Sequence, residues 1–229
     1  MDKGKKMLRT ILFAGTSLVV FLSASFALAG TPIPIGQTDD FEDGTLQGWG
    51  GGATLTNQAG GPTGRYLQVQ SDLAGSGHWG AQNASQWGGP TFKDYYSFGV
   101  SGIAMDIANF GPADLSLRLL FTTRSAGRWA TTNAIFLPAN SGWQHVVFGI
   151  KQADMTQVEG SGSYIAGMVN VSRWVIHHDP LGPSGHGGSD VIDATVGIDN
   201  IRAVPEPATV LLLAAGVLAA TGGRRSACG

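Results

Sequence analysis

The stretch SGIAMDIANFGPADLSLRLLFTT, residues 101–123, decides the fold class, because its apolar residues alternate with a period of two on both sides of a Gly-Pro turn. Alternation of this kind is typical of β-strands that bury one face. The residues of the two apolar faces are Ile103, Met105 and Ile107, then Leu115, Leu117, Leu119 and Phe121. The stretch therefore predicts two neighbouring strands.

Working outward, further stretches of the same character are bounded by Gly, Pro, Asn or Asp, as strands separated by turns should be. They are residues 53–57, 66–70, 78–85, 130–136, 143–148, 173–178 and 195–203. Only Lys151–Val158 has a pattern that favours a helical turn or two. Sheets with one apolar face must bury it on another layer, so the sequence predicts an all-β domain of two packed antiparallel sheets. A closed barrel is the alternative.

The first 29 residues read as a secretory signal peptide. Four basic residues precede an apolar stretch, Ile11–Ala27, and Ala27 and Ala29 form a small-x-small cleavage pattern. The mature chain is then expected to begin at Gly30. The alternative is an uncleaved membrane anchor, for which the apolar stretch is short.

A second apolar segment, Ala208–Ala220, lies near the other end. Pro205, Glu206 and Pro207 stand directly before it, and Arg224 and Arg225 follow it. Motif, short apolar segment and basic tail together resemble the PEP-CTERM sorting signal of Gram-negative, often biofilm-forming bacteria. The resemblance implies an exosortase as processing partner, transient insertion of the tail in the inner membrane, and delivery to the cell surface or extracellular matrix. A plain C-terminal anchor is the alternative.

We therefore divide the chain into a signal peptide (1–29), a β-sandwich domain (30–204) and a sorting segment (205–229). Of the 14 Lys and Arg residues, six lie in the two end segments, against two of the 16 Asp and Glu. The domain thus carries a net charge of about −6, whereas nucleic-acid binding needs a basic patch. We expect no nucleic-acid partner. The single cysteine, Cys228, lies in the tail, so the domain has no disulfide.

Four short motifs within the domain resemble the jelly-roll carbohydrate-binding modules of the galactose-binding-like group. They are DDFEDG followed by GW (39–49), SGIAMDI (101–107), GWQHVVF (142–148) and GIDNI (197–201). The resemblance implies a jelly-roll sandwich. Jelly rolls host many activities, so the fold alone does not give the function.

Acidic residues at the two ends of the domain suggest a metal site if the first and last strands pair. Carboxylate and carbonyl oxygens are the ligands that Ca²⁺ prefers. In the resembling modules a structural calcium lies here, which implies Glu42 and Asp199 as ligands, with Asp40 as a helper and carbonyls of the turn at residues 64–66. The alternative is that these acids cap turns and face solvent.

Glycan binding needs aromatic faces for sugar C–H groups and polar donors for hydroxyl groups. Trp143 and Trp174 stand in apolar strand patterns and are expected in the core, and Trp49 is expected to close one end of the sandwich. The remaining aromatic and basic candidates lie in polar, Gly-rich surroundings. These predicted glycan-binding residues are Trp79, Trp87, Tyr95, Tyr96, Arg124, Arg128 and Trp129. The alternative is that these rings point inward.

His177, His178, Asp179 and His186 raise the possibility of a transition-metal site. Adjacent strand residues point to opposite faces, however, which disfavours joint ligation by His177 and His178. The sequence contains no recognisable catalytic motif. We therefore expect an exported, non-catalytic protein that binds extracellular polysaccharide. A structural or adhesive biofilm-matrix protein without a specific glycan is the alternative, and a polysaccharide-acting enzyme comes third.

Overall fold

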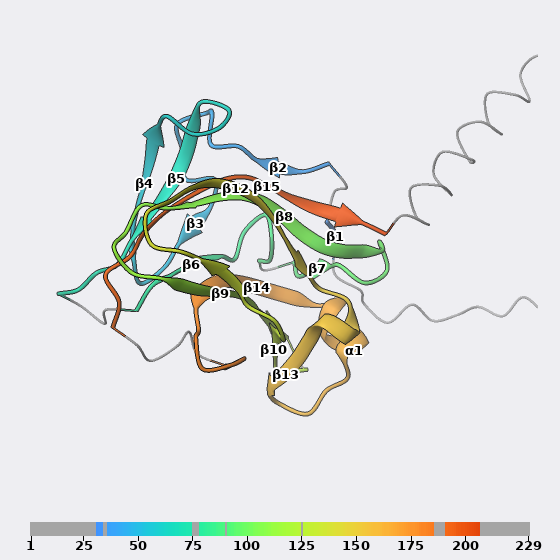
Figure 1. The fold of residues 1–229 in the computed structure, drawn as a ribbon. Helices are drawn as coiled ribbons and strands as arrows, with labels where there is room; N and C mark the ends of the chain where they lie inside the picture. Colours follow the sequence, from blue (N-terminus) through green and yellow to red (C-terminus); the bar gives the residue numbers. More distant parts are fainter. Residues whose placement is uncertain are drawn as a thin grey trace, which may run out of the picture.

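The computed structural model describes residues 31–33, 36–74, 78–89, 91–124, 126–185 and 191–206. Within these ranges the chain forms two packed β-sheets (Figure 1). The predicted two-sheet jelly-roll sandwich is thereby confirmed. Ala27, Ala29, Pro207, Arg224 and Arg225, together with His186, lie outside the described residues, and Pro205 and Glu206 lie within them. Among the described residues, no helix is long and apolar enough to cross a membrane.

The larger sheet has nine strands in the described part of the chain. Its pairing is antiparallel except between β1 and β7, which run parallel. The main path is β1 (Thr31–Pro32), β7 (Lys93–Asp94), β14 (Val171–His178), β9 (Leu115–Thr123), β10 (Arg128–Thr131) and β13 (Met155–Glu159). The side pairings place β11 (Ile135–Leu137) on β9, β6 (Gly80–Asn83) on β14, and β3 (Trp49–Gly50) on β6.

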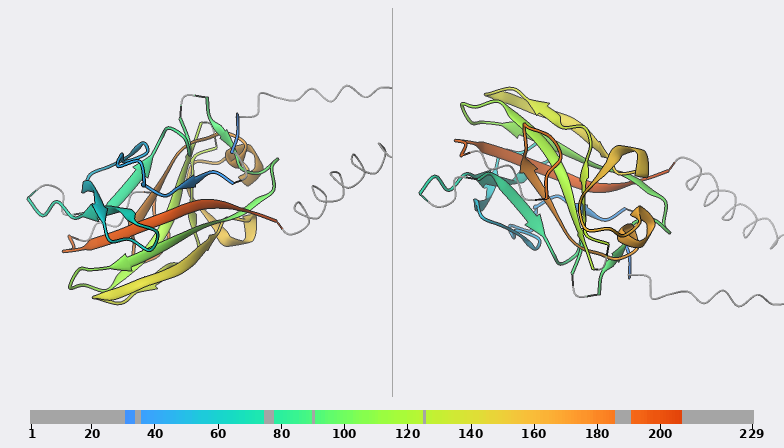
Figure 2. Two further views of the ribbon diagram at one scale, coloured as in Figure 1. Left: turned by 90° about the horizontal axis from the view of Figure 1, so that it is seen from above. Right: turned by 90° about the horizontal axis from the view of Figure 1, so that it is seen from below.

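The smaller sheet has six strands in the same described ranges. Its order is β12 (Ser141–Gly149), β8 (Val100–Asn109), β15 (Thr195–Pro205), β5 (Arg65–Gln70) and β4 (Thr54–Ala59), and β2 (Thr38–Asp39) also pairs with β15. Seen from above, β12, β8, β15 and β5 lie side by side (Figure 2). Through the pairing of β2 with β15, the first part of the domain meets the last.

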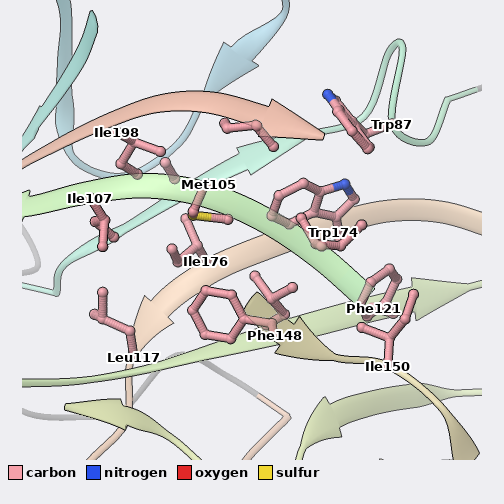
Figure 3. Close-up of a cluster of buried hydrophobic side chains, with 14 of the residues drawn as sticks. Trp87, Met105, Ile107, Leu117, Phe121, Phe148, Ile150, Trp174, Ile176 and Ile198 are labelled. Atoms are coloured by element: carbon pink, nitrogen blue, oxygen red, sulfur yellow. The ribbon is translucent and has the colours of Figure 1, made fainter. Parts of the chain in front are cut away.

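The hydrophobic core lies between the two sheets (Figure 3). Strand alternation supplies it from both sides, as the sequence predicts: Met105 and Ile107 on β8 face Leu117 and Phe121 on β9. These side chains are fully buried. Complete burial of such a side chain contributes about 1.5–3 kcal/mol relative to its exposure, so the core is the main source of stability.

Two predicted elements differ in the structure. Residues 130–136 contribute to two strands, β10 and β11, which both pair with β9. Between the two pairings the Leu119 amide of β9 donates to Thr131 Oγ1 at 3.1 Å instead of to a backbone carbonyl. Lys151–Val158 forms a 3₁₀ turn, η1 (Gln152–Asp154), followed by β13. The α-helix α1 (Tyr164–Met168) was not predicted. It has little more than one turn, and its N-cap is Ser163, whose hydroxyl accepts the Ala166 amide.

The face of the six-stranded sheet that points away from the nine-stranded sheet is called here the outer face. Alternation fixes its residues, because Val196 and Ile198 enter the core and Gly197 and Asp199 therefore point outward. In the same rows, Ala108 and Gln68 lie beside Gly197, and Asp106 lies beside Asp199.

Candidate functional site

The predicted aromatic binding set is wrong as a set, because four of its five rings belong to the core and only Tyr96, which is 47 % exposed, reaches the surface. Trp79 is 2 % exposed, Trp87 and Tyr95 are 0 % exposed, and Trp129 is 9 % exposed. Their polar atoms are mostly satisfied inside the protein. Trp79 Nε1 donates to the Val69 carbonyl at 3.0 Å, and the Tyr95 hydroxyl donates to the Trp87 carbonyl at 2.6 Å. None of these four buried rings can stack on a sugar while the domain is folded.

The two arginines of that set are occupied by other contacts. Arg128 forms an ion pair with Glu159 at 3.1 Å and donates to the Gly185 carbonyl at 2.6 Å. The guanidinium of Arg124 lies over the ring of Phe92, 4.9 Å from its centroid. Without Trp79, Trp87 and Trp129 beside them, these two residues do not form a stacking platform.

A different group of aromatic side chains lies on the outer face, and we call it the aromatic trio: Tyr66, Phe110 and Trp143. The three rings contact each other edge to face, with centroid separations of 5.2, 5.7 and 5.9 Å. Trp143 is half-buried and Phe110 is 41 % exposed. Trp143, predicted in the core, is therefore on the surface of the six-stranded sheet, whereas Trp174 is buried as predicted.

Gly197 provides the floor under this trio. A methyl group at Gly197 would come within 2.6 Å of the Trp143 ring and 2.8 Å of the Phe110 ring, well inside van der Waals contact. The edges of both rings therefore occupy the space that a side chain at position 197 would fill. Because Gly197 belongs to the GIDNI motif, the same segment supplies Asp199 two residues later.

Amide and hydroxyl side chains continue the outer face beyond the trio. Gln68 lies beside Gly197, and Thr56 and Gln58 lie on β4 opposite Gln68 and Tyr66. The Tyr66 hydroxyl contacts Gln68 Oε1 at 3.3 Å, and Gln58 Nε2 donates to Thr56 Oγ1 at 3.0 Å. These groups carry both hydrogen-bond donors and acceptors and are uncharged.

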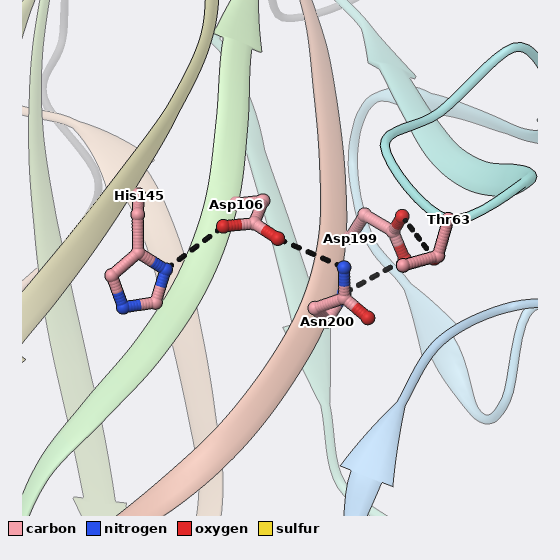
Figure 4. Close-up of polar contacts among 5 residues, drawn as sticks. All are labelled: Thr63, Asp106, His145, Asp199 and Asn200. Carbon is pink, nitrogen blue, oxygen red and sulfur yellow. Dashed lines mark hydrogen bonds and ion pairs between the residues drawn. The ribbon is translucent and has the colours of Figure 1, made fainter.

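A polar row crosses the outer face next to the trio (Figure 4). His145 Nδ1 and Asp106 Oδ1 are 2.8 Å apart, and Asp106 Oδ2 accepts from Asn200 Nδ2 at 2.8 Å. Asp199 then accepts the Asn200 amide at 2.7 Å and the Thr63 hydroxyl at 2.9 Å. Asn200 reaches Asp106 because a bulge in β15 gives it a φ of 54°, in the left-handed region that Asn tolerates.

The predicted calcium ligands meet at one turn. Glu42 Oε1 accepts the Arg65 amide at 2.7 Å, and Asp199 Oδ2 accepts from Thr63, so both carboxylates approach the turn between β4 and β5. Asp40 is instead held in its own turn, where its Oδ1 accepts from Gln47 Nε2 and from the Glu42 amide. Among the described residues, no three His, Cys, Asp or Glu side chains gather as metal ligands.

Asp199 is the acid of this group that gains most from a cation. It is fully buried, and none of the ion pairs found among the described residues involves it. Burial raises the pKa of Asp199, although the hydrogen bonds from Thr63 and Asn200 oppose the shift. Carboxylate oxygens are ligands that suit a hard cation. The calcium site itself stays a prediction.

The histidine cluster does not form a metal site in the part of the chain that is described. His178 Nδ1 accepts the Ser116 amide at 3.0 Å, which removes that nitrogen from ligation. His177 is buried on the opposite face of β14, and Asp179 follows it.

The outer-face site could be predicted only in part from the sequence. The alternation of Tyr66 with Leu67 and Val69 places Tyr66 on the polar side of its strand. Trp143 shares the parity of His145 and Val147, not that of the buried Phe148. The alternation in β12 could therefore have identified Trp143, but its apolar neighbours suggested the core instead.

Comparison with known proteins identifies one motif and one fold. Residues 203–226 match the model of the PEP-CTERM protein-sorting motif, so the chain carries the signal of an exported protein that an exosortase processes. No curated protein sequence matches the chain significantly.

Solved structures resemble the domain at low sequence identity. An exo-beta-agarase matches with a TM-score of 0.52 and 17 % identity over 73 % of this chain, which spans 24 % of the agarase. A family 11 carbohydrate-binding module from Clostridium thermocellum, in complex with a mixed-linked tetrasaccharide, matches with a TM-score of 0.46 and 17 % identity, covering 74 % of this chain and 95 % of the module. A CBM22 tandem domain from Paenibacillus barcinonensis matches with a TM-score of 0.45 and 18 % identity, covering 80 % and 49 %. At 17 % identity, the likeness to the agarase concerns the fold alone.

Proposed function

We propose that this exported domain binds polysaccharide on the outer face of its six-stranded sheet, without catalysing a reaction. The observation that carries the proposal is the aromatic trio, which lies outside the core and presents Phe110 and Trp143 to solvent. Large apolar rings in the core need no further explanation, but rings gathered on a polar sheet face do.

The chemistry of the face suits a sugar. Sugar rings present C–H groups on their faces and hydroxyl groups on their edges, so they bind where an aromatic surface adjoins hydrogen-bonding groups. Phe110 and Trp143 supply the aromatic surface. Gln58, Gln68 and Thr56 on the neighbouring strands supply uncharged donors and acceptors. A neutral polysaccharide is the ligand that this composition favours.

The sorting signal supports a role that depends on many copies. Delivery to the surface or matrix of a Gram-negative cell, after anchoring through the tail, would array many domains along the same polymer. Weak binding at each site would then become strong by avidity. Glycoside hydrolysis needs two carboxyl groups that flank the scissile bond. The acids of the outer face, Asp106 and Asp199, accept hydrogen bonds from Asn200 and Thr63, and we assign them a structural role.

The proposal is tested by a binding assay on a panel of polysaccharides. The assay uses the exported chain, residues 30–229, in mild detergent. Trp143→Ala is expected to weaken binding about tenfold, because loss of a central aromatic contact typically costs more than about 1 kcal/mol. Phe110→Ala should also weaken binding. Phe136→Ala is the matched control, since Phe136 is 58 % exposed but lies on β11 in the other sheet.

Three outcomes are informative. If Phe110→Ala and Phe136→Ala weaken binding equally, the aromatic trio is not the binding surface. If the folded protein binds no polysaccharide, a structural or adhesive matrix role replaces the proposal. Release of soluble sugar from a bound polymer would instead show catalysis.

As part of the same proposal, calcium binds beside Glu42 and Asp199 and stabilises the turn between β4 and β5. A bound cation would offset the burial of the Asp199 carboxylate. EGTA is therefore expected to lower the melting temperature by several degrees, since a ligand present at 100 times its Kd stabilises by about 2.7 kcal/mol. Glu42→Gln should remove most of this response. A melting curve that is the same in calcium and in EGTA would exclude the site.

A further inference from the structure

The folded domain extends into the sorting motif. Residues matched by the motif begin at 203, and β15 continues to Pro205. Ala203, Val204 and Pro205 pair with Ile103, Gly102 and Val100 of β8. The strand therefore runs one residue beyond the domain boundary that the sequence suggested.

Glu206, the acid of the Pro-Glu-Pro motif, contacts the domain through a hydrogen bond and an ion pair. Its amide donates to the Gly99 carbonyl at 2.7 Å, which continues the pairing of β15 past Pro205. Its carboxylate forms an ion pair with Lys151 at 3.2 Å. Glu206 and Lys151 both line a cavity of about 390 Å³ that also contacts Tyr96 and Tyr164.

Very few residues separate Glu206 from the apolar segment that begins at Ala208. Only Pro207 separates Glu206 from Ala208, the first residue of the apolar segment. One residue spans at most about 3.8 Å. An enzyme that reads the motif must accommodate several extended residues, and here those residues are still hydrogen-bonded to β8. Motif recognition and the folded strand end therefore compete for the same backbone.

We propose that the domain withholds its own sorting motif, so that the end of β15 must separate from β8 and Lys151 before the processing enzyme can act. The ion pair and the hydrogen bond from the Glu206 amide to the Gly99 carbonyl determine how often the end of β15 separates from β8. The Lys151 side chain is about half exposed, so the barrier is modest and processing is slowed without being blocked. This inference rests on the motif and its contacts and not on glycan binding.

Lys151→Glu in the full-length chain, expressed in a host with an active exosortase, tests the proposal. Repulsion of Glu206 should raise the rate of tail removal about two- to fivefold, the range that corresponds to an exposed ion pair. Lys151→Arg is the matched control, because it keeps the positive charge and should leave the rate unchanged. Pulse-chase labelling followed by separation of the two chain lengths measures the rate.

Hydrogen exchange of the Glu206 amide in the full-length chain gives an independent readout. The amide should be protected in the native chain and in Lys151→Arg, and should exchange faster in Lys151→Glu at an unchanged melting temperature. Two results would overturn the proposal: a Glu206 amide that exchanges like a free chain, or a processing rate that stays the same or falls in Lys151→Glu. A fall would mean that Lys151 presents the motif to the enzyme.

Discussion

Replacement of Asp39 by leucine is expected to lower the free energy of unfolding by about 3 kcal/mol. Asp39 on β2 is buried, and its Oδ2 accepts both the Trp49 indole at 2.8 Å and the Trp87 indole at 2.7 Å. Leucine has a similar branched shape but accepts no hydrogen bond. Each buried indole N–H left without an acceptor costs about 1–3 kcal/mol, and relief of the buried carboxylate offsets part of that cost.

The loss of stability in Asp39→Leu is expected to extend beyond the two indole hydrogen bonds, because Asp39 connects the two sheets. Trp49 and Trp87 both pack edge to face on Trp174, at centroid separations of 4.8 and 5.7 Å. β2 belongs to the six-stranded sheet, whereas Trp49 and Trp174 belong to the nine-stranded sheet. Asp39 therefore fixes the tryptophan cluster across the two layers. Burial raises the pKa of Asp39, and the indole hydrogen bonds oppose that shift.

Chemical denaturation followed by tryptophan fluorescence measures the effect. For a domain of this size, a loss of about 3 kcal/mol corresponds to a fall in melting temperature of about 6–12 °C. Asp39→Asn keeps an acceptor oxygen and should lose less than half as much. Asp193→Leu removes an exposed acid and controls for the change in net charge. A loss below about 1 kcal/mol in Asp39→Leu would show that the indoles find other acceptors.

The strands and their buried faces could be predicted because alternation is a local property. Met105 and Leu117 enter the core as their parity requires. The burial of Trp79 and Trp87 could not be predicted from their sequence neighbours, which are Gly and polar residues. Both side chains are buried because β6 and the loop after it pack against the six-stranded sheet. Their indole acceptors, the Val69 carbonyl and Asp39, lie 10 and 48 residues away. Tertiary pairing therefore overrode the local composition.

The same reasoning explains how far the candidate sites could be predicted. Glu42 and Asp199 meet at one turn because β2 pairs with β15, which was the condition for the predicted site. The aromatic trio depends on the registers of three strands and on the space above Gly197. The role of Gly197 beneath these rings can be recognised only when the neighbouring strands are known.

Acidification from pH 7 to pH 5 is expected to destabilise the domain through His177. The His177 side chain is buried, and neither ring nitrogen has a hydrogen-bond partner among the described residues. The pKa of His177 is lowered from 6.5 to about 4, mainly by burial; Asp179 opposes this shift, and the positive charge of Arg118 contributes to it. Folding therefore requires the neutral imidazole.

The direction follows from proton binding. Between pH 6.5 and pH 4 the unfolded chain binds a proton at His177 that the folded chain does not bind, so the free energy of unfolding falls with pH across this window. At pH 5 the loss is about 2 kcal/mol relative to pH 7. The raised pKa values of Asp39 and Asp199 act in the opposite direction, because the folded chain takes up those protons first.

His177→Phe separates these contributions, because it keeps an aromatic ring and removes the titration. Thermal unfolding at pH 7 and pH 5 should show a fall of about 4–8 °C in the native chain and little fall in His177→Phe. His145→Gln is the control, since His145 is half exposed on the outer face and should retain the native fall. The same fall in native chain and His177→Phe would place the acid sensitivity elsewhere. A loss of about 2 kcal/mol is a substantial share of a typical stability of 5–15 kcal/mol, and the domain has no disulfide that would offset it.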